Sequence, residues 1–379
     1  MGIKNCELRV SIIGTNGIPA CYGGFETLAE NLSKHLDSQV NLTIFCSKLQ
    51  KKYHYLPGER YGNTTLVYSR WEANGFQSVI YDCESLIRSS IKDDVIIYLG
   101  PVSGFLIPLL RFLGCKKNII VNHGGLNEWE REKMSFFERK LMKFGAKCAA
   151  RYSSTNIVDN KLYRDSIKKL FGADSIVIRY GGNHVKKTNI DNELLAKYPF
   201  LNHNYAVSVS RAQIDNNLHI LLEAYSNMPQ HTLVLISNWN ISDYGRKLKS
   251  QYGHKYSNII ILDAIYNQRE INAIRGNAEF YIHSHSRCGT APSLCEAMFL
   301  GLAIVSYDVP VNHETTQENA LFFKDVNSLM NVVNNLTPEK VMELAYASSQ
   351  IAAKEYNWKH IADQYLECIN NWGYRRQSK

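Results

Sequence analysis

The sequence predicts an α/β protein made of two doubly wound domains, each built on a parallel sheet. First, a short apolar run at residues 8–13 leads through a glycine loop into a helical pattern at 23–36. Second, the strand–loop–helix order restarts at 205–210 after the polar stretch 186–204. Third, 379 residues exceed one ordinary domain and suit two of about 150–200 residues each.

The first half of the chain alternates strands with helices. Apolar runs rich in β-branched residues and closed by polar or glycine residues predict further strands at 40–46, 64–68, 95–99, 118–121, 154–158 and 175–178. Apolar residues at helical spacing predict helices at 76–90 and 129–152. Because a glycine-rich turn at 180–183 ends this pattern, we place the first domain at residues 1–183.

The second half repeats the alternation. Its predicted strands lie at 205–210, 232–237, 259–262, 280–283 and 303–306, with a helix at 217–226 and others between and after the later strands. We place the second domain at 184–355. The sequence leaves open whether the C-terminal helix, within 356–379, stays with this domain or crosses back to the first.

Composition excludes several classes of protein. With 45% hydrophobic and 21% charged residues, the chain is globular rather than disordered. Its 9 scattered cysteines include no C-x-x-C pair, which indicates reduced thiols and argues against a zinc site or a disulfide scaffold. The net charge of +8 suits an acidic small molecule, an anionic membrane surface or nucleic acid. Because no C2H2, RNP or basic-zipper pattern occurs, nucleic acid is not an expected partner.

No long apolar segment points to a membrane span or a leader. The most apolar stretch, 102–113, is shorter than the ~20 residues that a bilayer needs. We therefore expect a cytoplasmic protein that is either free or peripheral to a membrane.

Four loops that follow predicted strands are candidate binding sites, because open α/β sheets bind ligands at the carboxyl ends of their strands. They lie at 14–26, 122–131, 211–217 and 284–298. In the first loop, Gly23 and Gly24 could let backbone N–H groups approach a phosphate, or could only form a tight turn. The loop has neither the G-x-G-x-x-G spacing nor a Walker lysine, which disfavours a nicotinamide dehydrogenase and a P-loop enzyme.

The other three loops contain charged or polar side chains. Each of these side chains could bind a ligand, but each also has a purely structural interpretation. The planar fork of Arg211 suits a diphosphate, although it could equally be a solvated surface arginine. Glu296 could accept hydrogen bonds from the vicinal hydroxyls of a sugar, or simply favour the N-terminus of its helix. His123 could bind a substrate hydroxyl, although histidines in loops are more often incidental.

Two segments are specific enough to suggest a family. Residues 17–27 read G-I-P-A-C-Y-G-G-F-E-T and residues 289–298 read G-T-A-P-S-L-C-E-A-M. Both resemble signature segments of the family 4 glycosyltransferases, within the bacterial rhamnosyltransferase-like branch of polysaccharide and O-antigen synthesis. Residues 308–316, and Arg211 with the Asn216-Asn217 pair, are similar to the same branch. The resemblance spans most of the chain and implies the GT-B fold, in which two Rossmann-like domains face a central cleft.

The resemblance also implies a site, residue by residue. The donor would be bound by Gly23, Gly24, Arg211, Asn217, Gly289, Thr290, Ser293 and Glu296. Within that set Arg211 pairs with the diphosphate and Glu296 binds the ribose. His123 lies near the transferred sugar, and His123 and Arg211 are the expected catalytic residues.

Four residues depart from the family pattern. Cys288 stands where family 4 usually has a second glutamate, and Asn217 lies near the place of the usual lysine partner of the arginine, although the branch tolerates both of these changes. Gly124 stands where the branch has an aspartate, and Cys21 where the branch has an arginine. These changes affect the expected acceptor or sugar specificity more than the expected fold.

The implied reaction is a retaining transfer of a sugar from a nucleoside diphosphate sugar to a hydroxyl of a lipid-linked glycan. Because the leaving group is a diphosphate, catalysis needs positive charge and N–H donors around it. dTDP-L-rhamnose is the favoured donor and a UDP- or GDP-hexose the alternative. No metal or other cofactor is expected. A non-catalytic nucleotide-sugar-binding protein and a sugar-nucleotide epimerase are the two rival interpretations.

Mixed aromatic and basic residues over 133–151 predict a helix that binds the inner face of the cell membrane. An ordinary helix that buries its apolar face remains the alternative interpretation.

Overall fold

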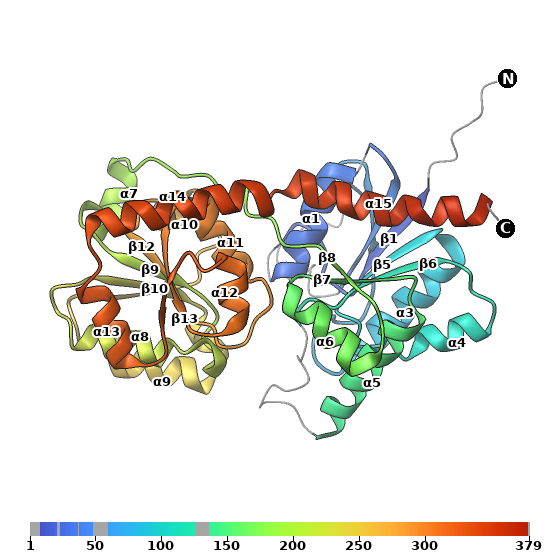
Figure 1. Ribbon diagram of the computed structural model, residues 1–379, viewed down its shortest axis with the longest axis horizontal. Coiled ribbons are helices and arrows are strands. Elements are labelled where there is room, and N and C mark those ends of the chain that lie inside the picture. The colour runs from blue at the N-terminus through green and yellow to red at the C-terminus, as the bar shows by residue number, and fades with distance from the viewer. Residues whose placement is uncertain (1–7, 21–22, 37, 48–59, 126–135, 378–379) are drawn as a thin grey trace. The chain divides into compact units, whose positions relative to one another are not determined.

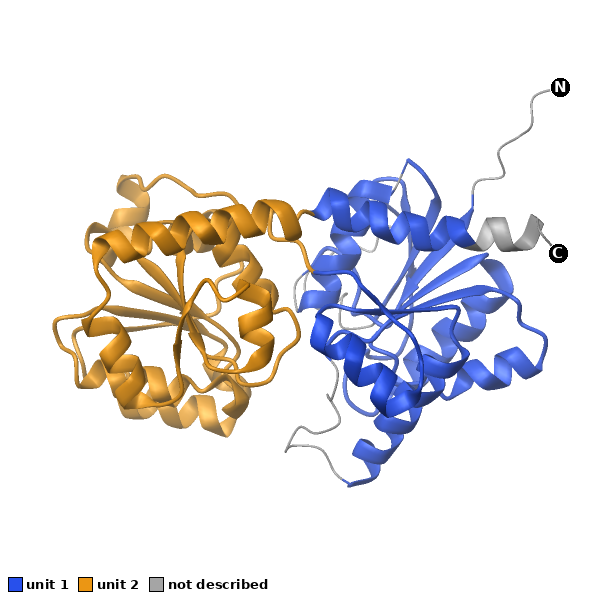
Figure 2. Cartoon of the chain, viewed as in Figure 1, with its two compact units in different colours: residues 1–179, 358–379 blue, residues 180–357 orange. Residues whose placement is uncertain are grey.

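A computed structural model describes residues 8–20, 23–36, 38–47, 60–125 and 136–377, with side chains up to residue 371. The chain divides into two compact units (Figure 2), one of Met1–Arg179 with Trp358–Lys379 and the other of Tyr180–Asn357. The boundary expected after residue 183 thus differs by a few residues from the one in the structure. The last helix, α15 (Trp358–Gln377), lies in the first unit.

The first unit is a mainly parallel sheet with helices on both faces (Figure 1). Its strands are β1 (Arg9–Ile13), β2 (Asn41–Cys46), β3 (Arg60–Tyr61), β4 (Thr64–Tyr68), β5 (Val95–Leu99), β6 (Asn118–Asn122), β7 (Thr155–Val158) and β8 (Ile176–Val177). Its helices, besides α15, are α1 (Gly24–Leu36), α3 (Gln77–Lys92), α4 (Leu106–Phe112), α5 (Phe136–Tyr152) and α6 (Lys161–Phe171). Among the described residues the strand order is β3-β4-β2-β1-β5-β6-β7-β8, and only the β3–β4 pair is antiparallel.

The central strands of this sheet are buried from end to end. Every residue of β5 and β6 is buried. Strands covered by helices on both faces bury both sets of side chains, which is why they read as continuous apolar runs. α15 also packs against this sheet: Asn118 Nδ2 donates to the Cys368 carbonyl (3.1 Å) and Asn122 Nδ2 to the Tyr365 hydroxyl (2.7 Å).

The second unit repeats this architecture. Its strands are β9 (Ala206–Val209), β10 (Leu233–Ser237), β11 (Ile259–Asp263), β12 (Phe280–His283), β13 (Ala303–Tyr307) and β14 (Leu321–Phe323). The elements that flank them are α7 (Asn192–Lys197), η2 (Pro199–Asn202), η3 (Ile214–Asn216), α8 (Leu218–Ser226), η4 (Trp239–Ile241), α9 (Asp243–Tyr252), α10 (Gln268–Gly276), α11 (Pro292–Phe299), α12 (Pro310–Thr316), α13 (Val326–Asn334) and α14 (Pro338–Glu355). The described strands are all parallel, in the order β11-β10-β9-β12-β13-β14.

In each sheet there is one strand from which the chain adds later strands first on one side and then on the other. In the first unit the chain goes from β1 to β2 on one side and later places β5 on the other side of β1. In the second unit β9 likewise lies between β10 and β12. Ligands of open α/β sheets bind at such a switch point, at the carboxyl ends of the strands.

The predicted strands agree closely with the structure, but the short strands β3 and β14 were not expected, and 303–306 is not the last strand. The helices differ more. The described part of the helix expected at 129–152 begins at Phe136, and the rest of that expectation lies outside the described residues. The short helices α4 and α6 of the first unit were not expected.

Candidate functional site

The loop after β9 places Arg211 at the switch point of the second unit. The Arg211 side chain is exposed and forms no hydrogen bond or ion pair with any described residue. Its carbonyl oxygen, by contrast, accepts hydrogen bonds from the Gln213 amide (2.8 Å) and from Asn216 Nδ2 (2.7 Å). The backbone is therefore held while the guanidinium remains available to an anion.

The loops after β9 and β12 are joined by hydrogen bonds. Asn217, in the left-handed conformation with a φ of 51°, donates from Nδ2 to the Ser284 carbonyl (3.0 Å). Ser284 Oγ donates to the Asn216 carbonyl. The amide and hydroxyl of Ser286 both donate to the Asp215 carbonyl, each over 2.9 Å. The amide group of Asn217 thus links two loops, and the role in donor binding expected for it stays a prediction.

The segment that resembles the family signature lies at the start of α11. Gly289 and Ser293 are half-buried, and Thr290 is buried. The Ser293 side chain hydrogen-bonds Tyr281 on β12, whose hydroxyl donates to the Val209 carbonyl (3.1 Å). Donor binding by these three residues stays a prediction.

Glu296, on α11, is a nearly buried carboxylate held between two basic side chains. Arg275 Nη1 donates to Oε2, and His184 Nε2 lies 3.1 Å from Oε1. Burial opposes ionisation, but the charge of Arg275 and the hydrogen bond from His184 outweigh it and hold the pKa of Glu296 at about 2. The alternative that Glu296 only favours its helix N-terminus is inadequate, because Glu296 lies beyond the first turn and has these specific partners.

In the first unit, the carboxylate of Glu26 stabilises the loop after β1 through hydrogen bonds, and this residue was not a candidate in the sequence analysis. The amide of Asn16 and its Nδ2 donate to Glu26 Oε1 over 2.8 and 3.0 Å, and Ser47 Oγ donates to Asn16 Oδ1 over 3.1 Å. The two glycines expected to bind the diphosphate lie at the start of α1. Gly23 is exposed and Gly24 begins the helix. A Cβ atom on Gly23 would lie 3.2 Å from Glu26 Oε2, so a negative charge already lies beside this helix start. Diphosphate binding by Gly23 and Gly24 stays a prediction.

The departure at Gly124 has a packing explanation. Gly124 has a φ of 57°, and a Cβ there would lie 2.9 Å from the Phe25 ring. Gly100, at the end of β5, has a φ of 62°, and its Cβ would lie 2.8 Å from the same ring. The Phe25 ring therefore occupies space that side chains at both strand ends would need, which no local pattern could reveal.

His123, at the end of β6, is buried with one ring nitrogen paired. Its Nε2 lies 2.9 Å from Asn156 Oδ1. Asn156 Nδ2 donates to the carbonyls of Ala150 (2.9 Å) and Asp174 (3.1 Å), which identifies Oδ1 as the acceptor and His123 Nε2 as the donor. Burial lowers the pKa of His123 to about 4, so the ring is neutral and Nδ1 carries a lone pair without a partner among the described residues.

Sequence reasoning missed a group of ligand-type side chains around Cys288. The ligand atoms of His283, His285 and Cys288 all lie within 4.8 Å of one another. Burial lowers the pKa of His283 to about 3, so its ring is neutral at ordinary pH. The spacing H-x-H-x-x-C is visible in the sequence, but it contains no C-x-x-C pair, and the expectation against a zinc site rested on the absence of such pairs.

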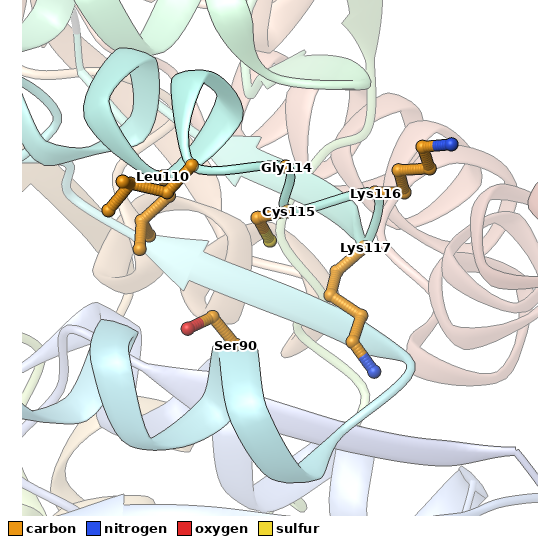
Figure 3. A pocket seen from close by; sticks show the side chains of 7 residues that line it. Ser90, Leu110, Gly114, Cys115, Lys116 and Lys117 are labelled. Atoms are coloured by element: carbon orange, nitrogen blue, oxygen red, sulfur yellow. The ribbon is translucent and has the colours of Figure 1, made fainter.

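A cavity of about 430 Å³ in the first unit lies away from these loops (Figure 3). It is lined by Ser90 at the end of α3, Leu110 on α4 and the turn 113–117, which precedes β6. It therefore opens at the amino end of β6, opposite to the end that carries His123. This position does not suit a ligand of the switch point.

Helix α5 changes character along its length. Its second half packs inward through Gly145, Ala146 and Ala149. Its first half exposes Phe136, Phe137 and Phe144 by 66, 83 and 56%, and Lys140 lies over the Phe136 ring. The basic residue Lys133, which belongs to the predicted membrane-binding segment, lies outside the described residues. No helix in the described ranges is both long and apolar enough to cross a bilayer.

Comparisons with known proteins bear on the fold. Residues 7–183, slightly less than half of the chain, match a family model described as a domain of unknown function, DUF1972. No curated protein sequence matches the chain. Among solved structures, the sucrose-phosphate synthase of Thermosynechococcus elongatus superposes with a TM-score of 0.76 at 15% identity, over 97% of this chain and 100% of that one.

Two further structures are similar. A glycosyltransferase from Rickettsia africae gives a TM-score of 0.70 at 12% identity, covering 97% of this chain and 99% of that one. An E. coli structure described as trehalose-6-phosphate bound with UDP-2-fluoro glucose gives 0.70 at 11% identity, covering 95% and 98%. The chain has the GT-B fold. The fold expected from the sequence is thereby confirmed, whereas identities this low identify neither the branch nor the substrates.

Proposed function

We propose that the chain is a retaining glycosyltransferase that binds a nucleoside diphosphate sugar at the switch point of its second unit. The observation that carries the proposal is the exposed Arg211 guanidinium, which has no ion-pair partner among the described residues and follows β9 at this switch point. A permanently charged, planar donor group at this position suits a diphosphate. As the sugar leaves, negative charge grows on the diphosphate, and Arg211 stabilises it.

In this proposal, Glu296 binds the ribose of the donor. Its carboxylate is ionised, and among the described residues each oxygen has one partner, Arg275 or His184. A carboxylate offers about four lone-pair positions, which leaves capacity for two ribose hydroxyls. Arg275 and His184 act as positioning residues because they orient the carboxylate.

His123 contributes through its Nδ1 lone pair. Because Asn156 fixes the proton on Nε2, His123 presents an acceptor and not a donor. We assign it to a hydroxyl of the transferred sugar. A lone pair with no protein partner is satisfied when that hydroxyl donates to it.

We propose dTDP-L-rhamnose as the donor, on the resemblance of the loops at 17–27 and 289–298 to the rhamnosyltransferase-like branch. A UDP- or GDP-hexose is the alternative, and the similar E. coli structure is described as bound with UDP-2-fluoro glucose. The proposed acceptor is a lipid-linked glycan at the cytoplasmic face of the cell membrane. The exposed aromatic rings on the first half of α5, with Lys140 and Lys143 among them, support this location.

The experiment is a thermal-shift panel of nucleotides and nucleotide sugars, followed by product mass analysis with the protecting donor and a polyprenyl-linked acceptor. A rise in melting temperature with a nucleotide sugar, together with a product heavier by one sugar, supports the proposal. Protection by UDP or GDP sugars alone overturns the rhamnose assignment. Binding without transfer or hydrolysis indicates a non-catalytic binding protein, and an isomeric sugar nucleotide formed without acceptor indicates an epimerase.

A further inference from the structure

We propose that His283, His285 and Cys288 form a Zn²⁺-binding site at the carboxyl end of β12. Their ligand atoms lie within 4.8 Å of one another. Two imidazoles and one thiolate form a ligand set that zinc, a borderline-soft cation, binds in many proteins. The inference depends on these side chains alone and does not depend on the proposed sugar transfer.

The separations of the side chains fit a tetrahedral ion. Bonds of about 2.0 Å to nitrogen and 2.3 Å to sulfur place neighbouring ligand atoms roughly 3.5 Å apart. Cys288 Sγ lies 3.9 Å from His283 Nε2, and the ring centroids of His283 and His285 lie 4.3 Å apart. His283 is buried on β12, whereas His285 and Cys288 are half-buried and can rotate by the small amount that closure around an ion requires.

Asn312 adds an oxygen at the same point. Its Nδ2 donates to the carbonyls of His285 (3.1 Å) and Tyr307 (2.9 Å), and this fixes Oδ1 toward Cys288 Sγ at 3.5 Å. The oxygen accepts a weak hydrogen bond from a neutral thiol, but it repels a thiolate unless a cation lies between them. Asn312 Oδ1 or a water is therefore the fourth ligand, and binding replaces the thiol proton of Cys288 with the metal ion.

The site would order one loop of the second unit. Ser284 and Ser286 already fasten this loop to Asn216 and Asp215. A metal on His283, His285 and Cys288 adds a second attachment immediately before Gly289. Zinc binding is thus expected to stabilise the folded chain, because an ion bound only by the native state shifts the unfolding equilibrium.

The test uses the full chain, reduced and stripped of metal by a chelator, and titrated with Co²⁺ as a spectroscopic probe and then with Zn²⁺. We expect one equivalent of Co²⁺ to bind with a sulfur-to-cobalt charge-transfer band and tetrahedral visible bands. Zn²⁺ should abolish both sets of bands and raise the melting temperature.

Variants assign the signal to residues. Cys288→Ser should abolish the charge-transfer band, and His285→Gln should weaken Zn²⁺ binding by more than about 100-fold. Cys83→Ser changes a half-buried thiol of the first unit and should behave like the parent protein. Metal-free melting curves of each variant report on folding. Absence of the band in the parent protein, or its persistence in Cys288→Ser, would overturn the proposal.

Discussion

Arg275 on α10 and Glu296 on α11 form an ion pair whose side chains are only 5 and 14% exposed. Removing one member of such a pair leaves a buried charge, which costs about 3 kcal/mol. The relationship changes what a substitution at Glu296 measures, because the carboxylate has a structural partner as well as a proposed ligand.

The first prediction separates these two roles. Glu296→Gln should lower the melting temperature and weaken donor binding roughly tenfold or more, with little change in the transfer rate at saturating donor, because the ribose does not change during reaction. Arg275→Gln breaks the same ion pair but keeps the carboxylate, so it should lower the melting temperature with a smaller loss of donor affinity. Calorimetric donor titration measures both variants. If Glu296→Gln binds donor as tightly as the parent protein, Glu296 is only structural.

The second prediction concerns Arg211. Because its guanidinium is exposed and without a described partner, Arg211→Ala should leave the melting temperature unchanged. It should weaken nucleoside diphosphate binding by ~1.5–3 kcal/mol, or roughly 10- to 150-fold, and also slow transfer. Arg246→Ala is the matched control, since Arg246 is an exposed arginine of the same unit paired with Asp243. Equal nucleotide affinity in the two variants would contradict the assignment of Arg211.

The third prediction concerns membrane binding by α5. The protein should pellet with anionic vesicles at low salt and be released at high salt, since the attraction is electrostatic. Reversing the charges of Lys140 and Lys143 to glutamate should abolish pelleting. The same change at Lys161 and Lys169 of α6 is the control and should have little effect. Equal binding to neutral vesicles, or none to either, counts against the membrane surface.

The fourth prediction is a pH dependence of stability that originates at Asp82. This carboxyl is buried, its Oδ2 accepts from the Tyr98 hydroxyl at 2.6 Å, and burial raises its pKa to about 7. Between about pH 4 and 7, the native state therefore holds a proton that the unfolded chain has lost. As the pH rises through this range, the contribution of Asp82 to the free energy of unfolding falls by at most about 1.4 kcal/mol per pH unit.

Denaturant unfolding at several pH values tests this dependence. His123 and His283 have lowered pKa values, so their contribution to the stability of the native state rises with pH over part of the same range. The comparison is therefore made against Asp82→Asn, which keeps the hydrogen bond from Tyr98 but cannot ionise. The variant should gain stability relative to the parent protein as pH rises. A constant difference across the range would show that Asp82 does not titrate there.

The fifth prediction tests the contact between Gly124 and Phe25. Gly75→Ala should cost about 1 kcal/mol, because Gly75 has a φ of 65° but nothing lies within 4 Å of its Cβ position. Gly124→Ala has the same backbone cost and adds overpacking against Phe25 of about 1–3 kcal/mol. Adding Phe25→Leu to Gly124→Ala should recover part of the loss. Equal destabilisation by the two glycine substitutions would remove the packing explanation.

The fold class, and the edges of the sheets at which ligands are expected to bind, could be predicted from the amino-acid sequence alone. Strand β5 reads V-I-I-Y-L and the centre of β6 reads I-I-V because both faces of the sheet are covered, and this apolar pattern can be read without any structure. The segments that contain His123, Arg211 and Glu296 could be located for the same reason, since each follows a recognisable strand.

Which side chains contact one another could not be predicted in this way and is known from the three-dimensional structure. Glu296 pairs with Arg275, 21 residues away, and with His184, 112 residues away, and no local pattern encodes such partners. The strand order that places β9 beside β12 depends on how the whole sheet assembles. The tautomer of His123 depends on Asn156, and the glycine at 124 depends on Phe25. Each of these facts is a contact between segments distant in sequence, whereas periodicity and spacing report only on neighbours along the chain.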